Sequence, residues 1–508
     1  MTDDTQVFIG TAEEKQFLNL KLANRHGLVT GATGTGKTVT LQILAEGFSR
    51  AGVPVFCADV KGDLSGLAAE GVSKDFLEKR AREVGLEKSY TYEAAPAVFW
   101  DLLGEQGHPI RTTVTEMGPL LISRLLELSE AQEGVLNIAF RLADEEGMAL
   151  LDLKDLQALL VHVGERAGEL GLRYGNISPA SVGAIQRRLL VLENQGGAKL
   201  FGEPALELSD MMWTDVDGRG MISVLAADTL MSSPRLYATF LLWLLSELFE
   251  ELPEVGDPDK PKMVFFFDEA HLLFDDAPKA LVDKVEQVAR LIRSKGVGVF
   301  FITQNPADVP EDILGQLGNR VQHALRAFTA KDRKELRQAA ETYRENPRFN
   351  TEDAIREVGV GEAVTSFLQP KGVPGVVERT LIRPPSSRLG PVDKSVRRAV
   401  IDGSPIAGKY ETVKDRESAY EILTRRAAEA AREAEDAEKK AEAAEDETER
   451  EFRSARRYSP GGTARKTSRS RRGDTLGEAL GKAVIKELGG TTGRRIVRGI
   501  LGGLFKSR

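Results

Sequence analysis

Apolar residues along this chain form short continuous runs separated by stretches of helical periodicity. In the intervening stretches, such as 39–48, apolar residues recur at helical spacing, and further helices are expected at about 234–252 and 278–294. Uninterrupted apolar strands that alternate with helices are typical of a parallel sheet with both faces covered. This pattern predicts an α/β core made of residues 1–63 and 216–385. The expected strands lie at 27–30, 53–59, 221–227, 263–267, 297–302, 321–325, 361–368 and 376–382.

The remaining segments have other patterns. Residues 64–215 carry mainly helical spacings and are too long for a simple crossover, so we expect a helical insertion there. Residues 386–412 follow two prolines and predict a linker. Residues 413–451 are rich in Ala, Glu, Arg and Lys, which indicates a solvated, charged helical arm. Residues 452–508 form a basic Gly/Ser/Arg-rich tail that we expect to be partly disordered.

The composition suits a cytoplasmic protein without disulfides. Hydrophobic residues make up 41% of the chain and charged residues 29%, as expected for a globular protein. Cys57 is the only cysteine, which excludes an internal disulfide and a cysteine-based metal cluster. The first residues lack the charged-then-apolar order of a secretion signal, so we expect none. The strongest apolar run, 240–245, is too short to span a bilayer and predicts a buried helix.

The net charge of −8 hides an asymmetry between body and tail. From 452 to 508 there are 15 Lys or Arg residues against three acids, so the rest of the chain is strongly acidic. The final segment, 494–506, is basic and apolar with closely spaced glycines. It could dock on the acidic body or a neighbouring subunit, bind nucleic-acid phosphates, or contact a membrane surface. Membrane contact is the least expected, because each glycine disfavours a helix by roughly 1 kcal/mol relative to Ala.

Residues 31–38 read Gly-Ala-Thr-Gly-Thr-Gly-Lys-Thr, a complete phosphate-binding loop between an expected strand and an expected helix. Its glycines let the backbone curve around an anion with N–H groups pointing at phosphate oxygens. Lys37 can reach the terminal phosphates, and the Thr38 hydroxyl can ligate Mg²⁺. The predicted nucleotide-binding residues are Gly31, Ala32, Thr33, Gly34, Thr35, Gly36, Lys37, Thr38 and Val39.

Two adjacent acids follow the apolar strand at 263–267. Asp268 is placed to hold the Mg²⁺ water shell beside Thr38, and Glu269 to orient and polarise a water that attacks the terminal phosphate. The alternative is that the pair caps the next helix. After a full phosphate loop, the pair favours a hydrolase over a kinase.

A polar residue, Gln304, ends the strand at 297–302 and would lie beside these acids. We predict that it senses the terminal phosphate. Its amide could instead satisfy the turn at Asn305-Pro306.

Four segments together resemble the HerA/FtsK superfamily of ring-forming ATPases, in particular the bacterial group of HerA-helicase C-terminal-domain-like proteins. They are residues 31–38, Asp59-Val60-Lys61-Gly62-Asp63, Asp268-Glu269-Ala270-His271 and Thr303-Gln304-Asn305-Pro306. The resemblance covers about residues 7–385 and extends to the tail. It implies a RecA-like P-loop core, bound ATP and Mg²⁺, and a homo-oligomer, expected to be a hexamer, with ATP between subunits.

HerA itself carries a β-barrel domain before the ATPase core. Only 26 residues precede Gly27 here, so we expect that domain to be missing. The nuclease partnership that the barrel serves is therefore doubtful.

A ring ATPase needs a cation from the neighbouring subunit to stabilise charge on the phosphates. Arg293 matches the position of the family's trans arginine, and Arg320 is the alternative; either could equally be a surface residue paired with acids. Asp59 could assist the Mg²⁺ shell, hold the phosphate loop or form a turn. His271 could relay the nucleotide state or cap a helix.

These observations predict a Mg²⁺-dependent ATPase that powers translocation on nucleic acid, with DNA as a possible partner. The alternative is an ATP-switched assembly or scaffolding protein that moves no DNA, which the acidic body keeps open. A kinase is disfavoured because no second-substrate motif is recognisable.

Overall fold

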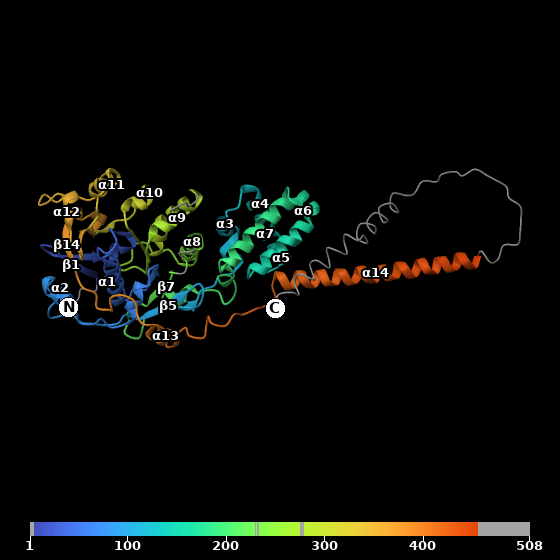
Figure 1. Cartoon of the computed structure of the whole chain (residues 1–508), viewed down its shortest axis with the longest axis horizontal. Helices are drawn as coiled ribbons and strands as arrows, with labels where there is room; N and C mark the ends of the chain where they lie inside the picture. The colour runs from blue at the N-terminus through green and yellow to red at the C-terminus, as the bar shows by residue number, and fades with distance from the viewer. Residues whose placement is uncertain (1–4, 229, 231–232, 275–278, 456–508) are drawn as a thin grey trace. The chain divides into compact units, whose positions relative to one another are not determined.

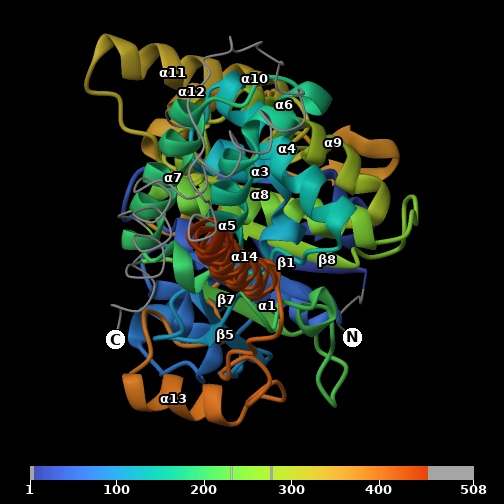
Figure 2. The same cartoon turned by 90° about the vertical axis from the view of Figure 1, so that its right-hand side faces the viewer.

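The computed structural model describes residues 5–228, 230, 233–274 and 279–455 (Figures 1 and 2). Over these residues, the main sheet has twelve strands. In spatial order they are β2 (Lys15–Asn19), β1 (Gln6–Thr11), β14 (Glu378–Ile382), β11 (Glu362–Ser366), β10 (Asn319–Gln322), β3 (Gly27–Thr30), β9 (Val297–Thr303), β8 (Met263–Phe267), β4 (Val55–Asp59), β7 (Ile222–Ala226), β5 (Ala97–Asp101) and β6 (His108–Pro109).

The sheet is parallel from β10 to β6 and antiparallel from β11 to β2. The expected parallel sheet is thus confirmed, with an antiparallel edge added. Because β3, β9, β8 and β4 are parallel neighbours, their carboxyl ends meet at one edge of the sheet. Ligands bind outside this edge in such folds.

Alternate residues of the central strands enter two different cores. Phe265 and Phe267 of β8 pack into a cluster with α8 (Pro234–Glu251) and α9 (Lys279–Ile292). Phe266 faces the other way and packs on Phe48 of α1 (Lys37–Arg50), with ring centroids 6.1 Å apart. This alternation covers both faces of the sheet and fixes its register, since a one-residue slip would exchange the faces.

The helical insertion expected at 64–215 is only partly helical. The run at 97–101 forms β5, which pairs with β7 inside the main sheet. Its short length and the proline before it hide the strand within helical surroundings. The five helices that follow gather beside α8 (Figure 1). They are α3 (Val114–Leu125), α4 (Glu130–Glu146), α5 (Leu153–Glu165), α6 (Ala167–Tyr174) and α7 (Pro179–Asn194).

The linker expected at 386–412 is a folded part of the first compact unit, residues 1–429. Its helix α13 (Lys394–Asp402) lies against β5, where the Arg397 guanidinium stacks over the Phe99 ring at 4.6 Å. The arm expected at 413–451 is the helix α14 (Ala419–Ala455). Its first turn is anchored by buried Ala419 and Leu423. From 430 to 451, where the second unit begins, its side chains are almost all exposed.

The described residues also form four shorter helices. They are α2 (Asp75–Glu83), α10 (Glu311–Leu314), α11 (Ala330–Glu341) and α12 (Thr351–Glu357). A small separate strand pair, β12 (Leu368–Gln369) with β13 (Val373–Pro374), closes the turn between β11 and β14. The described helices include none long and apolar enough to cross a membrane. The tail expected at 452–508 lies, from residue 456 on, outside the described residues.

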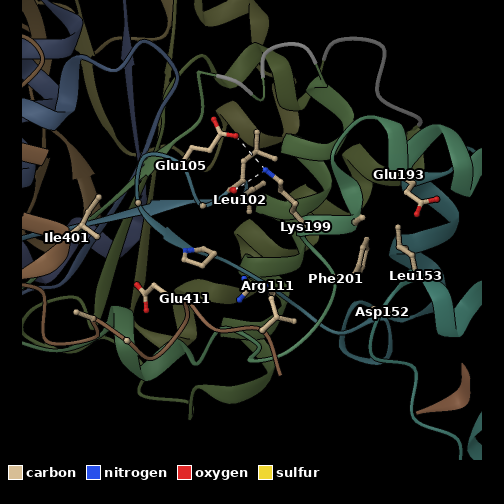
Figure 3. Close-up of a pocket in the computed structure, with 18 of the residues that line it drawn as sticks. Leu102, Glu105, Arg111, Asp152, Leu153, Glu193, Lys199, Phe201, Ile401 and Glu411 are labelled. Carbon is tan, nitrogen blue, oxygen red and sulfur yellow. Dashed lines mark hydrogen bonds and ion pairs between the residues drawn. The ribbon is translucent and has the colours of Figure 1, made fainter. Parts of the chain in front are cut away.

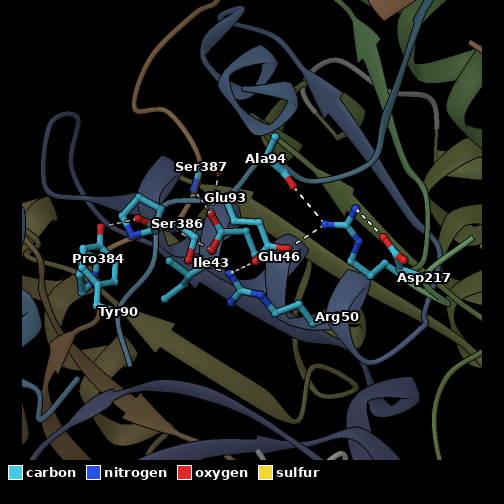
Figure 4. A network of polar contacts seen from close by, with 12 residues as sticks. Ile43, Glu46, Arg50, Tyr90, Glu93, Ala94, Asp217, Pro384, Ser386 and Ser387 are labelled. Carbon is cyan, nitrogen blue, oxygen red and sulfur yellow. Dashed lines mark hydrogen bonds and ion pairs between the residues drawn. The ribbon is translucent and has the colours of Figure 1, made fainter. Parts of the chain in front are cut away.

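A buried ion pair joins α1 to the segment after β14 (Figure 4). Arg383 Nη2 lies 3.2 Å from Glu46 Oε2, and both side chains are less than 7% exposed. The backbone N–H groups of Ser386 and Ser387 and the Ser387 hydroxyl also donate to the Glu46 carboxylate, at 2.7–3.1 Å. Arg383 donates in addition to the carbonyls of Phe8, Ile43 and Pro384. Satisfied charges of this kind lock α1, and so the loop before it, in place.

Candidate functional site

The loop at 31–38 leaves β3 and enters α1 at Lys37. Gly31, Gly34 and Gly36 all have φ between +78° and +147°, which residues with a Cβ rarely adopt. Lys37 Nζ folds back onto the loop and donates to the carbonyls of Gly31 at 2.6 Å and Ala32 at 3.2 Å. The residue types required by the motif thus build a curved, glycine-dependent cradle at a helix N-terminus.

A buried histidine that the sequence analysis did not single out supports this cradle. His323 follows β10, with Nε2 2.8 Å from Thr40 Oγ1 and Nδ1 2.8 Å from the Glu362 carbonyl. A Cβ on Gly31 would lie 2.5 Å from the Cβ of His323, so Gly31 is also required for space. Burial lowers the pKa of His323 to about 4, so it is neutral at pH 7. The only signal in the sequence is a polar Gln-His pair at a strand end.

Four charged side chains converge where β4 and β8 end. Asp59 ends β4, and Asp268 and Glu269 follow β8, its parallel neighbour. Lys61, two residues after Asp59, forms an ion pair with Glu269 Oε1. Glu269 is 4% exposed, so this pair is the main compensation for a buried charge.

Burial and repulsion by neighbouring carboxylates raise the pKa of both aspartates, Asp59 and Asp268. Burial, followed by the charge of Asp268, raises the pKa of Asp59 to about 7. Burial, followed by the charge of Glu269, raises the pKa of Asp268 to about 6. Burial also opposes the charge of Glu269, but the Lys61 ammonium group, with smaller contributions from Gln304 and His271, holds its pKa below the ordinary value. Glu269 therefore stays ionised, whereas a cation bound at this edge would favour the ionised forms of Asp59 and Asp268.

Glu269 also has an unusual backbone. Its φ of 48° and ψ of 50° lie in the left-handed region, which costs a residue with a side chain of order 1–3 kcal/mol. His271 Nδ1 lies 3.4 Å from the second carboxylate oxygen, Oε2. The structure thus brings Gln304 and His271 close to Glu269, and for Gln304 the sequence predicts this position. Glu269 occupies the N-cap position of the short helix Ala270–Leu273, which includes His271, but its side chain makes no capping hydrogen bond.

The acidic edge contains an unsatisfied carboxylate oxygen that suits a Mg²⁺ ion or its water shell. Asp59 Oδ1 is buried and, within the described residues, has no hydrogen-bond partner, whereas its Oδ2 accepts from Leu64 N at 3.0 Å. A buried, unpaired carboxylate oxygen is costly unless a cation or water completes it. No group of three His, Cys, Asp or Glu side chains in the described part of the chain is arranged to hold a metal alone. Mg²⁺ would therefore take Thr38, Asp268, water and phosphate oxygens.

Neither candidate trans arginine lies near this edge. Arg293 precedes β9, and Gln304 follows the other end of that seven-residue strand, which is about 23 Å long. The Arg293 guanidinium pairs with Asp257 at 3.3 Å and is 40% exposed. Arg320 donates to the Leu317 and Leu314 carbonyls at 3.0 and 2.8 Å. Arg320 is therefore engaged in capping α10, while Arg293 remains more available to a second chain.

Two cavities lie along the carboxyl side. One, of about 390 Å³, borders the site and is lined by Ala32, His271, Gln304, Asn305, Asp308, Leu325, Arg326, Asp332 and Glu335. Another, of about 660 Å³, lies beside β5 and β6 and shares none of these residues (Figure 3). Several of its charged side chains pair with each other, such as Lys199 and Glu105 at 3.5 Å, which point toward one another in Figure 3.

Residues 5–508 match the family model described as helicase HerA-like C-terminal. No curated protein matches the chain. Among solved structures, VirB4 of Thermoanaerobacter pseudethanolicus aligns with a TM-score of 0.50 and 15% identity, covering 75% of this chain and 97% of that one. The unbound conjugative coupling protein TrwB gives 0.47 and 14%, covering 77% and 92%. TrwB in complex with ADP and Mg²⁺ gives 0.45 and 15%, covering 73% and 89%. At these identities the likeness to VirB4 concerns the fold.

Proposed function

The chain belongs to the helicase HerA-like C-terminal family, and from this we propose that it is a Mg²⁺-dependent ATPase whose site is the carboxyl edge of β3, β8 and β4. One observation carries the proposal. A buried carboxylate, Glu269, is held beside a complete phosphate-binding loop with its pKa below the ordinary value. A base that stays ionised and faces the terminal phosphate is what hydrolysis requires.

The phosphates of ATP would sit in the cradle of residues 31–38. Lys37 would exchange the carbonyls of Gly31 and Ala32 for the β- and γ-phosphates, which are stronger acceptors for an ammonium group. Thr38 and Asp268 would hold Mg²⁺, with Asp59 close behind. The ion, when bound, neutralises part of the phosphate charge.

Glu269 would accept the proton of the attacking water, and Gln304 would report the presence of the γ-phosphate. Arg293 would act from a second copy of the chain, so the active form would be a homo-oligomer, with a hexamer as the expected size. Arg293→Ala should abolish hydrolysis in an intact oligomer while ATP binding stays unchanged. Wild-type turnover by that variant would reject the assignment.

We propose further that hydrolysis powers translocation on nucleic acid. The family description as a helicase favours this use. A scaffolding role remains the second candidate, because the exposed, charged helix α14 is suited to partner binding. The two differ in one measurement. ATP turnover, measured with and without single- and double-stranded DNA over a salt series, should rise with one of them. Turnover indifferent to every nucleic acid at low salt would reject translocation and leave the scaffold.

A further inference from the structure

Lys61 stands out at the candidate site, because no role follows for it from the loop or from the paired acids. It lies in the turn after β4, just before Gly62, whose φ of 77° lets the chain reverse. From this turn the ammonium group reaches Glu269 on the neighbouring strand end. The Lys61 side chain is 40% exposed and that of Glu269 is 5% exposed. A partly solvated cation therefore holds a buried anion.

The two oxygens of Glu269 have different surroundings. Oε1 is bound by Lys61. Oε2 is buried, and the described residues give it no hydrogen bond, although the His271 ring nitrogen lies 3.4 Å away. The carboxylate is thus anchored through one oxygen, while the other oxygen keeps its hydrogen-bonding capacity. A general base needs this arrangement, since the oxygen that accepts the proton must not already be occupied.

We infer that Lys61 is a positioning residue for the hydrolytic reaction: it fixes Glu269 through Oε1 so that Oε2 faces the attacking water. This inference rests on the proposed ATPase activity and adds a second lysine to its site. Lys61 acts through Glu269, whereas Lys37 acts on the phosphates. The left-handed backbone of Glu269 persists only if surrounding contacts hold it, and the ion pair with Lys61 is one of these contacts.

A purely structural ion pair would behave differently. The loss of Lys61 leaves the buried Glu269 carboxylate without its cation, so it also lowers stability. A positioning role predicts, in addition, a slower chemical step per folded molecule, which a purely structural pair would not give. A displacement of the reacting group by about 1 Å is enough to lower a rate about 100-fold.

The test compares Lys61→Met, Lys61→Arg and Lys409→Met as full-length chains. Lys409 is a matched control, because it is 34% exposed and pairs with Glu207 and Asp210 at 2.8 and 2.7 Å away from the site. We expect Lys61→Met to lower kcat about 10- to 100-fold with KM for ATP unchanged within about threefold. Lys61→Arg should recover most of the loss, because a guanidinium can still donate to Oε1. Lys409→Met should keep wild-type kcat.

Glu269→Gln, assayed in parallel, separates this inference from the function beneath it. If Glu269→Gln is inactive while Lys61→Met retains kcat within about twofold of wild type, the inference is wrong and the ATPase assignment stands. A higher KM with unchanged kcat in Lys61→Met also overturns it, since Lys61 would then bind nucleotide. If Glu269→Gln turns over ATP normally, the proposed function itself fails. Binding of a fluorescent ATP analogue confirms that each variant is folded.

Discussion

Two buried glutamates in this molecule have similar chemistry and opposite surroundings. Glu46, on α1, receives Arg383, two backbone N–H groups and a serine hydroxyl, and both of its oxygens are engaged (Figure 4). Glu269, after β8, receives Lys61 at one oxygen and has a second buried oxygen without a hydrogen bond from the described residues. The first network is complete within the chain, and the second is not.

This difference indicates that the Glu46 network contributes to stability, whereas the surroundings of Glu269 serve the chemistry of the site. A satisfied buried network rigidifies a fold, whereas an incomplete one is costly unless something outside the chain completes it. The incomplete region also holds an unpaired oxygen on Asp59, two raised aspartate pKa values and a left-handed glutamate. These costs all fall beside the phosphate-binding loop. The comparison therefore predicts that substitutions in the Glu46 network lower stability and that substitutions around Glu269 lower turnover.

The largest change in stability is expected for Glu46→Ala. This substitution leaves Arg383 buried without its partner and should lower the free energy of unfolding by about 3–5 kcal/mol. Urea unfolding measures the loss, and turnover per folded molecule should stay within about twofold of wild type. A loss below about 1 kcal/mol, or a selective loss of turnover, would break the comparison.

In the ligand-free protein, Asp59→Asn should become more stable relative to wild type as pH rises. The folded pKa of Asp59, about 7, lies above its ordinary value of 3.8. Between these values the folded chain keeps a proton that the unfolded chain has released, so wild-type stability falls as pH rises toward 7. The asparagine of the variant does not titrate, so the variant lacks this fall in stability.

The stability of Asp59→Asn relative to wild type should therefore improve by about 2–3 kcal/mol from pH 5 to pH 8. Urea unfolding at the two pH values measures the difference. If the variant and wild type differ in stability by the same amount at both pH values, Asp59 is ionised in the folded protein throughout this range. Its raised pKa could then no longer be counted among the energetic costs of the site.

The smallest effect is expected where a pair is neither buried nor near the site. Lys79 and Glu83 lie 3.8 Å apart on α2, with side chains 72% and 41% exposed. Lys79→Ala should change the free energy of unfolding by no more than about 0.5 kcal/mol and leave turnover unchanged. A larger loss would mean that ion-pair geometry alone, without burial, decides stability here.

Much of this architecture can be predicted from the sequence, because it depends on the spacing of neighbouring residues. The glycines and lysine of residues 31–38 are contiguous, and Asp268-Glu269 ends an apolar run, so both motifs can be read without a fold. Parallel neighbours then bring their strand ends together by topology. The expected helices at 234–252 and 278–294 correspond to α8 and α9 within two residues.

The missed features depend on contacts between distant segments. β5 is a five-residue strand whose partner, β7, lies more than 120 residues away. His323 and Lys61 make their contacts only in the folded sheet. His323, after β10, reaches Thr40 of α1, and Lys61, after β4, reaches Glu269. The linker at 386–412 has little apolar periodicity of its own, but Arg397 stacks on a ring contributed by β5. No local pattern contains these pairings.

The central claim is that the carboxyl edge of the sheet hydrolyses ATP with Glu269 as the base. The most direct measurement is single-turnover hydrolysis of ATP by wild type and by Glu269→Gln, with ATP affinity measured on the same samples. We predict a rate at least about 100-fold lower for Glu269→Gln and unchanged affinity, because the amide keeps the shape of the side chain but cannot take the proton. Equal rates for the two proteins at equal affinity would contradict the account.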